Sequence, residues 1–152
     1  MTDPITFDST TDRLGLPLLF VGQAQKEFYV NEAHALLDIL VHGAIEGAAA
    51  DPPATAADGE AWLVTAPASG AWTGQEDSLA CRLGGGWRFI SPQDGMRLLD
   101  RSTGGEIRYL GNWRKAADVV EPIGGSTVDS EARAVITNLI AALRVMGLLP
   151  AA

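Results

Sequence analysis

Two Trp-Arg pairs, Trp87-Arg88 and Trp113-Arg114, each follow a turn that contains Leu-Gly, and both could contribute to sugar binding. An exposed indole ring can stack on the apolar face of a sugar, and a guanidinium group donates hydrogen bonds to hydroxyl or carboxylate oxygens. Small sheets also bury tryptophan as the bulk of a thin core, so each ring has a purely structural alternative.

Strand alternation separates the tryptophans into candidates for the core and for the surface. Trp87 and Phe89 are two residues apart on one strand and therefore point to the same face, which favours a core position for Trp87. Trp72 and Trp113 lie beside turns, where an exposed ring is easier to place. We therefore predict that the glycan-binding residues are Trp72, Trp113 and Arg114.

The other reactive side chains form no recognisable catalytic or metal-binding pattern. Glu76 and Asp77 are adjacent in a loop and point apart, whereas acid-base hydrolysis needs two carboxylates across a cleft. His34 and His42 would lie about 12 Å apart along a helix, too far for one ion to bridge. Cys81 lies in an alternating run typical of a buried strand. We expect no catalytic residues, no metal site and no cofactor, and hence no enzyme.

Composition narrows the classes of partner. The chain has 152 residues, nearly half of them apolar, and a net charge of −8 with no basic run, so nucleic acid is not an expected ligand. No apolar run reaches the length of a membrane span, and no signal peptide is visible. We expect a protein that is made in the cytoplasm and does not insert into membranes.

Helical and strand patterns follow one another along the chain. A helix is predicted over residues 31–46 with Asn31 as its N-cap, followed by a Pro- and Gly-rich loop. Short alternating runs over residues 60–114, residues 71–74 among them, predict an antiparallel meander of five or six strands. The fold class is α+β, with an N-terminal helical segment, a small antiparallel β meander and a C-terminal oligomerisation helix. The predicted divisions are residues 1–50, 51–116 and 117–152.

The C-terminal helix carries an apolar seam. Asp129 is its predicted N-cap, and Gly147 is placed to end it. Four apolar residues within it have the spacing of a heptad, namely Ile136, Leu139, Leu143 and Met146. So apolar a helix needs a partner, which could be the β region, the first helix or copies of itself.

Several short motifs together resemble one family. Its opening pattern is present as Leu16-Pro17, Gln23-Ala24-Gln25-Lys26, Asn31-Glu32-Ala33 and Leu37-Asp38. The runs "PPATAADGEAWLV" and "GGGWRFISPQDGMRLL" continue the likeness. Over about residues 14–149 the chain resembles DUF2793, a family found in alphaproteobacterial prophages and gene transfer agents.

The resemblance implies a component of a virion or gene-transfer-agent particle, either a head spike or tail fibre protein or the base of one, that takes part in host-cell attachment. The implied partners are copies of the chain, most simply in a homotrimer, together with other particle proteins and host capsular polysaccharide. One alternative is an adaptor that only anchors another fibre protein. A polysaccharide depolymerase is a further alternative, and the resemblance supplies no catalytic residues for it.

Overall fold

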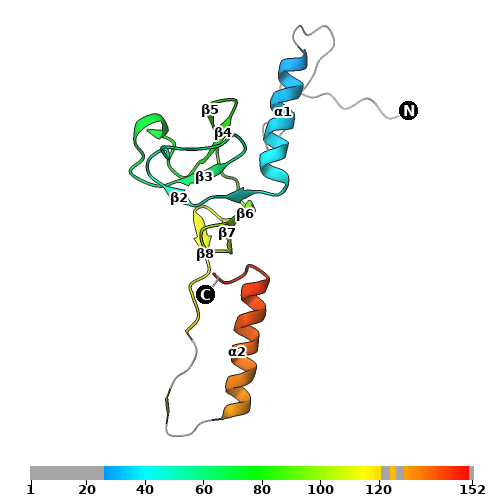
Figure 1. The fold of residues 1–152 in the computed structure, drawn as a ribbon, viewed down its shortest axis with the longest axis vertical. Helices are drawn as coiled ribbons and strands as arrows, with labels where there is room; N and C mark the ends of the chain where they lie inside the picture. The colour runs from blue at the N-terminus through cyan, green and yellow to red at the C-terminus, as the bar shows by residue number, and fades with distance from the viewer. Residues whose placement is uncertain (1–25, 121–123, 126–128, 151–152) are drawn as a thin grey trace, which may run out of the picture. The chain divides into compact units, whose positions relative to one another are not determined.

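The described part of the chain, residues 26–120, 124–125 and 129–150 of a computed structural model, contains two α-helices and eight strands (Figure 1). This is the α+β class predicted from the sequence. The chain divides into two units between His42 and Gly43. The first ten elements are α1 (Lys26–Val41), β1 (Ala44–Ile45), β2 (Ala48–Ala49), β3 (Ala61–Val64), the 3-10 helix η1 (Gly70–Trp72), β4 (Leu79–Leu83), β5 (Gly86–Ile90), β6 (Arg97–Asp100), β7 (Gly105–Tyr109) and β8 (Trp113–Lys115), and α2 (Ser130–Val145) follows.

Helix α1 begins and ends earlier than the predicted helix at residues 31–46. Asn31 therefore lies within the helix and is not its N-cap. Lys26 and Glu27 are good helix formers and extend the helix toward the N-terminus, whereas Gly43 favours its end. The other predictions for residues 1–25 lie outside the described residues.

The strands of the second unit form two four-stranded sheets, ordered β1-β6-β7-β8 and β2-β3-β4-β5. Strands β3 to β8 correspond to predicted runs, and their hairpin pairs are antiparallel. The remaining two strands come from residues 44–49, which the sequence assigned to a helix end and a loop. Ala44 pairs in parallel with Leu99 of β6, and Ala48 pairs in parallel with Leu63 of β3, so one short segment adds an edge strand to each sheet.

Residues 70–72 form a turn of 3-10 helix, although the sequence pattern predicted a strand at 71–74. The amide of Trp72 donates a 3.0 Å hydrogen bond to the carbonyl oxygen of Ser69. Gly70 adopts a φ of 58°, which a residue with a side chain rarely accepts. This turn directs Trp72 into the interior, where it is fully buried.

Tryptophans fill the centre of the β2-β3-β4-β5 sheet. Buried Val64, Trp72 and Ala80 form the core cluster, and Trp62 and Trp87 pack against it while remaining half-buried. The rings of Trp72 and Trp87 meet edge to face with centroids 5.0 Å apart. Edge-to-face pairs of this kind add to the stability that their buried area provides.

The two sheets are joined by direct contacts between side chains and backbone. The indole Nε1 of Trp113 in β8 donates a 2.8 Å hydrogen bond to the carbonyl oxygen of Asp77, which precedes β4. Glu46, between β1 and β2, forms an ion pair with Arg101 after β6. Within the β1-β6-β7-β8 sheet, Tyr109 packs against its pairing partner Trp113 at a ring separation of 5.3 Å. The hydrogen bond from Trp113 to Asp77 thus joins the two sheets outside their strand pairing.

Helix α2 has the ends that the sequence predicted. The Asp129 carboxylate accepts a 2.9 Å hydrogen bond from the amide of Ala132, and Gly147 adopts a φ of 70°. The amide of Leu148 donates to the carbonyl oxygen of Leu143, the pattern of a Schellman C-cap. The carbonyl oxygen of Gly147 also accepts a 2.6 Å hydrogen bond from the amide of Glu106 in β7, which ties this end of the helix to the sheet.

Candidate functional site

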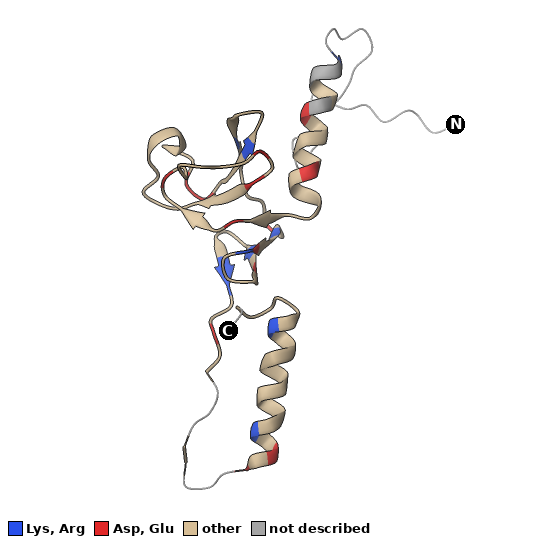
Figure 2. Cartoon of the chain, in the orientation of Figure 1, with Lys and Arg blue, Asp and Glu red and all other residues tan. Residues whose placement is uncertain are grey.

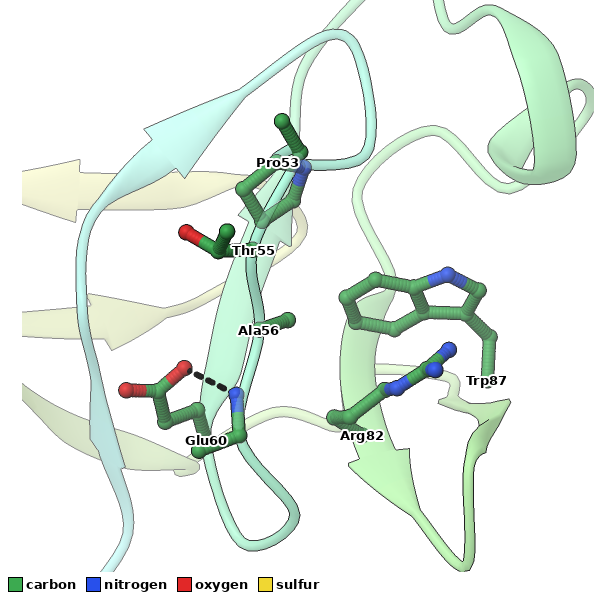
Figure 3. A pocket seen from close by; sticks show the side chains of 8 residues that line it. Pro53, Thr55, Ala56, Glu60, Arg82 and Trp87 are labelled. Carbon is green, nitrogen blue, oxygen red and sulfur yellow. Dashed lines mark hydrogen bonds between the residues drawn. The ribbon is translucent and has the colours of Figure 1, made fainter.

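A groove of about 640 Å³ lies beside the hairpin of β4 and β5 (Figure 3). One wall is the loop that follows β2, and the other carries an arginine and a tryptophan. Its lining residues are Pro53, Ala54, Thr55, Ala56, Ala57, Glu60, Arg82 and Trp87. A concave surface with an aromatic ring and a few polar groups is the usual form of a small-ligand site.

Arg82 and Trp87 are positioned by the hairpin itself. The two residues are directly opposite in the β4-β5 register, so their side chains emerge on the same face. The guanidinium carbon of Arg82 lies 5.3 Å from the centroid of the Trp87 ring, a cation–π distance. The pair therefore presents an aromatic surface and charged hydrogen-bond donors side by side.

Glu60 holds the loop that forms the opposite wall. Its Oε2 atom accepts a 2.8 Å hydrogen bond from the amide of Ala57, drawn as the dashed line in Figure 3. The amide of Arg82 in turn donates a 2.9 Å hydrogen bond to the carbonyl oxygen of Glu60. Asp58 accepts a 3.1 Å hydrogen bond from the amide of Gly85, which ties the loop to the hairpin turn. The end of the wall nearest β3 is thus anchored to the hairpin.

The Trp87 ring rests on the other tryptophans of the sheet. Its centroid is 5.6 Å from that of Trp62 and 5.0 Å from that of Trp72, and both pairs meet edge to face. A ring supported in this way loses little conformational freedom when a ligand binds. Trp87 therefore packs against the core and also lines the groove.

The chemistry of the groove suits a sugar. The indole offers an apolar surface, the Arg82 guanidinium donates hydrogen bonds, and the Glu60 carboxylate accepts them. A sugar ring presents C–H groups on its faces and hydroxyl groups at its edge, so it can use all three. Among the described residues that line the groove, Glu60 supplies a carboxylate.

Trp72 is not available to a ligand, which corrects the prediction that it binds glycan. Its exposed fraction is 0%, and a fully enclosed ring offers no face for stacking. Its indole nitrogen has no hydrogen-bond partner among the described residues. Sequence position beside a turn suggested exposure, but the 3-10 turn points the ring inward.

Trp113 and Arg114 lie together on β8, away from the residues of the groove. Trp113 is half-buried, and its Nε1 atom is occupied by Asp77. Arg114 is exposed, with its Nε atom donating to Asn112 and its Nη2 atom to the carbonyl oxygen of Leu110. Both residues line a cleft of about 190 Å³ that also includes Ile45 and Leu63 from the two sheets.

The sequence pattern did not predict the groove, because strand alternation placed Trp87 in the core alone. The Trp87–Phe89 face does pack against the core cluster, as the alternation predicted. A signal for the groove was nevertheless present in the sequence. A short glycine turn at residues 84–85 places Arg82 opposite Trp87, and that pairing can be counted from the turn.

The predicted oligomerisation residues lie mainly on the exposed surface of α2. Ile136, Leu139 and Met146 are 41%, 57% and 69% exposed, and Leu143 is half-buried. Val135 beside them is also exposed, whereas Ile140 is buried. The helix therefore carries an apolar face that the described part of this chain leaves largely uncovered.

The histidines and the cysteine of the described residues do not form a metal or catalytic cluster. His34, Asp38 and His42 are exposed, and no group of three or more potential ligands suited to a metal occurs within the described ranges. Burial raises the pKa of the Cys81 thiol to about 12, so the sulfur is protonated and unreactive near neutral pH. No helix among the described residues has the length and apolar character to span a membrane.

Comparison with known families places most of the two sheets in a described family. The model of a family described as "Protein of unknown function (DUF2793)" matches residues 30–114, which begin within α1 and end in β8. This confirms the family resemblance seen in the sequence motifs. The matched range includes the whole groove and both sheets except for Lys115 at the end of β8. No curated protein matches the chain.

Proposed function

The chain belongs to the DUF2793 family, and from that premise we propose that it is a non-enzymatic structural component of a phage-like particle, part of a fibre or spike or its base. In this role it takes part in attachment to the host cell by binding surface polysaccharide. The protein acts in the particle as a homo-oligomer and contacts other particle proteins.

The observation that carries the proposal is the uncovered apolar face of α2. Leu139 and Met146 are more than half exposed and belong to a heptad series, so water contacts apolar surface that a helical partner would cover. Copies of the same helix offer the matching face at the same spacing. A trimer around α2 is the assembly we propose, in line with the appendages that the family resemblance implies.

The groove supports the attachment role. Trp87, Arg82 and Glu60 combine an aromatic surface with a donor and an acceptor on an anchored scaffold. The use of several copies in one particle would multiply a weak sugar contact, since linked sites bind with an effective concentration far above that of free ligand. Modest affinity in each groove is therefore sufficient for attachment.

A binding assay against cell-surface polysaccharides of candidate host strains tests the attachment role. We expect the unaltered protein to bind at least one polysaccharide, and Trp87→Ala and Arg82→Gln each to weaken that binding by about tenfold or more. Arg88→Gln is the matched control for Arg82→Gln, because it removes an exposed arginine of the same hairpin whose side chain points to the opposite face. Circular dichroism of each variant separates lost binding from lost folding.

An adaptor that anchors another fibre protein is the second candidate, because an exposed apolar helix face can also receive a different protein. The same assay separates the two functions. If no host polysaccharide is bound while a second particle protein co-purifies with the chain in a fixed ratio, attachment is wrong and the adaptor role holds.

A further inference from the structure

Three arginines form a row across one exposed face of the β6-β7-β8 sheet. Arg97 is directly opposite Arg108, and Arg108 is directly opposite Arg114. All three are exposed. Neighbouring strands are about 4.8 Å apart, so the row presents three positive charges over roughly 10 Å. Figure 2 shows basic residues on these strands, although the chain as a whole has a net charge of −8.

The row lacks matching negative charge within the described residues. Like charges placed directly opposite one another destabilise a sheet. Glu106 approaches Arg97 at 3.9 Å, but both side chains are largely exposed, so this ion pair is weak. Arg108 has no hydrogen bond or ion pair with any residue that the structure describes. An external anionic partner would relieve the repulsion that the row contains.

Arg114 is already held in position for such a partner. Its Nε atom donates a 3.0 Å hydrogen bond to Asn112, and its Nη2 atom donates a 3.1 Å hydrogen bond to the carbonyl oxygen of Leu110. On the same strand, the hydrogen bond from Trp113 to Asp77 fixes β8 against the other sheet. A guanidinium of fixed orientation loses less conformational entropy on binding than a free one, and its other N–H groups remain available.

The row borders a surface hollow of about 370 Å³. Lys115 also lines the hollow, and Glu106 is the one carboxylate among its described lining residues. Glu106 belongs to the same strand as Arg108 and repels anions at its own position, so the anionic groups of a ligand would follow the arginines. The full lining is Arg97, Glu106, Arg108, Arg114, Lys115, Ala116 and Leu148.

We propose that this arginine row is a second binding site, for a linear polysaccharide that carries carboxylate groups along its length. Guanidinium groups bind carboxylates with two parallel hydrogen bonds, and an even row matches a polymer with regularly repeated acidic groups. The inference rests on the proposed attachment function, and it specifies that the surface polysaccharide is acidic. Its site lies on a different sheet from the Trp87 groove.

Other polyanions fit this surface less well. An acidic peptide usually binds a sheet by adding a strand at its edge, whereas the row crosses the strands on the face of the sheet. Nucleic acid carries a dense phosphate charge along a long backbone and usually binds an extended basic surface, whereas this row holds three arginines. An acidic polysaccharide needs neither strand pairing nor an extended basic surface.

Binding to polygalacturonate, a polymer of carboxylated sugars, tests the site. The variant Arg97→Gln/Arg108→Gln removes two charges and leaves the hydrogen bonds of Arg114 intact. Lys26→Gln/Arg88→Gln is the matched control, because it also removes two exposed positive charges. We expect about tenfold weaker binding for the row variant and a smaller dependence on salt, with the control close to the unaltered protein.

Three outcomes would overturn the proposal. The row variant could bind polygalacturonate as tightly as the control, neutral dextran could bind as tightly as polygalacturonate, or polyglutamate or double-stranded DNA could bind more tightly. Purified host polysaccharide then separates the two proposals. If Trp87→Ala abolishes binding to host polysaccharide and the row variant does not weaken it, the arginine row is wrong and the attachment proposal stands. If the unaltered protein does not bind host polysaccharide but the polygalacturonate results hold, the row stands and the attachment proposal is wrong.

Discussion

The indole Nε1 of Trp113 donates a 2.8 Å hydrogen bond to the carbonyl oxygen of Asp77, and this bond joins the two sheets of the second unit. Asp77 has a φ of 64°, an uncommon value for a residue other than glycine. Its own amide donates a 2.9 Å hydrogen bond to the carbonyl oxygen of Val64. Asp77 is thus held from both sides, and Trp113, for which glycan binding stays a prediction, also joins the two sheets.

Replacement of this tryptophan should weaken the junction between the sheets. Trp113→Phe keeps an aromatic ring but removes the Nε1 donor, so we expect a loss of about 0.5–1.5 kcal/mol in the free energy of unfolding. Urea denaturation provides the measurement. An unchanged free energy of unfolding would contradict the role given to the hydrogen bond.

Truncation of the buried tryptophan should be far more costly. Trp72→Ala would empty the centre of the β2-β3-β4-β5 sheet, and we expect a loss of about 3–5 kcal/mol. Trp62→Ala, at a half-buried position beside it, should cost less. The midpoints of thermal unfolding rank the two variants, and the reverse order would show that Trp72 is not the centre of this core.

The Cys81 thiol should remain unreactive until the protein unfolds. Burial raises its pKa to about 12, whereas an unfolded cysteine ionises near pH 8.5. The folded state therefore holds the proton more tightly, so the stability from this residue is complete below about pH 8.5 and is lost as the pH rises toward 12.

Labelling with a thiol reagent at mildly alkaline pH measures the reactivity of Cys81 in the folded protein directly. We expect modification of Cys81 to follow global unfolding, with a rate that increases in urea. In parallel, Cys81→Ala should lose stability less steeply with rising pH than the unaltered protein. Rapid labelling of the folded protein would contradict the assignment of a buried, protonated thiol.

The start of α2 should depend on its N-cap. Asp129→Ala removes the acceptor for the Ala132 amide, and we expect a local loss of about 0.5–2 kcal/mol. Hydrogen exchange at the amide of Ala132 reports this loss. Asp129→Asn should retain most of the protection because asparagine is also a good N-cap, so equal exchange in the two variants would argue against the cap.

The apolar face of α2 should determine the oligomeric state. Leu139→Asp/Met146→Asp places charge on two strongly exposed positions of that face, whereas Ala141→Asp places it on another side of the helix. We expect light scattering to give a multiple of the 16.0 kDa chain mass, three by our proposal, for the unaltered protein and the Ala141 control. The double variant should be monomeric; an unchanged mass would reject the face as an interface.

The sequence was most informative where structure depends on neighbouring residues. Asp129 and Gly147 define the ends of α2 through local hydrogen bonds and a positive φ, and short glycine turns define the hairpins of β4 to β8. The α+β class followed from these local signals. The oligomeric state and the function remain predictions.

Features that depend on contacts between residues far apart in the chain could not be predicted from local sequence patterns. Strands β1 and β2 are each two residues long and exist because they pair in parallel with β6 and β3, which are far along the chain. The apolar pattern near Ile45 continued that of α1 and therefore suggested a longer helix. Alternation gave the face of Trp87 correctly, but it could not show that the ring reaches beyond the core to the groove.

The most direct test of the account is the position of this protein in a cryo-electron microscopy map of phage-like particles from cells that encode it. We predict that the chain is present in fixed stoichiometry in a fibre or spike or at its base, with α2 at a symmetry axis and the Trp87 groove facing outward. Absence of the chain from purified particles that are otherwise complete would contradict the account.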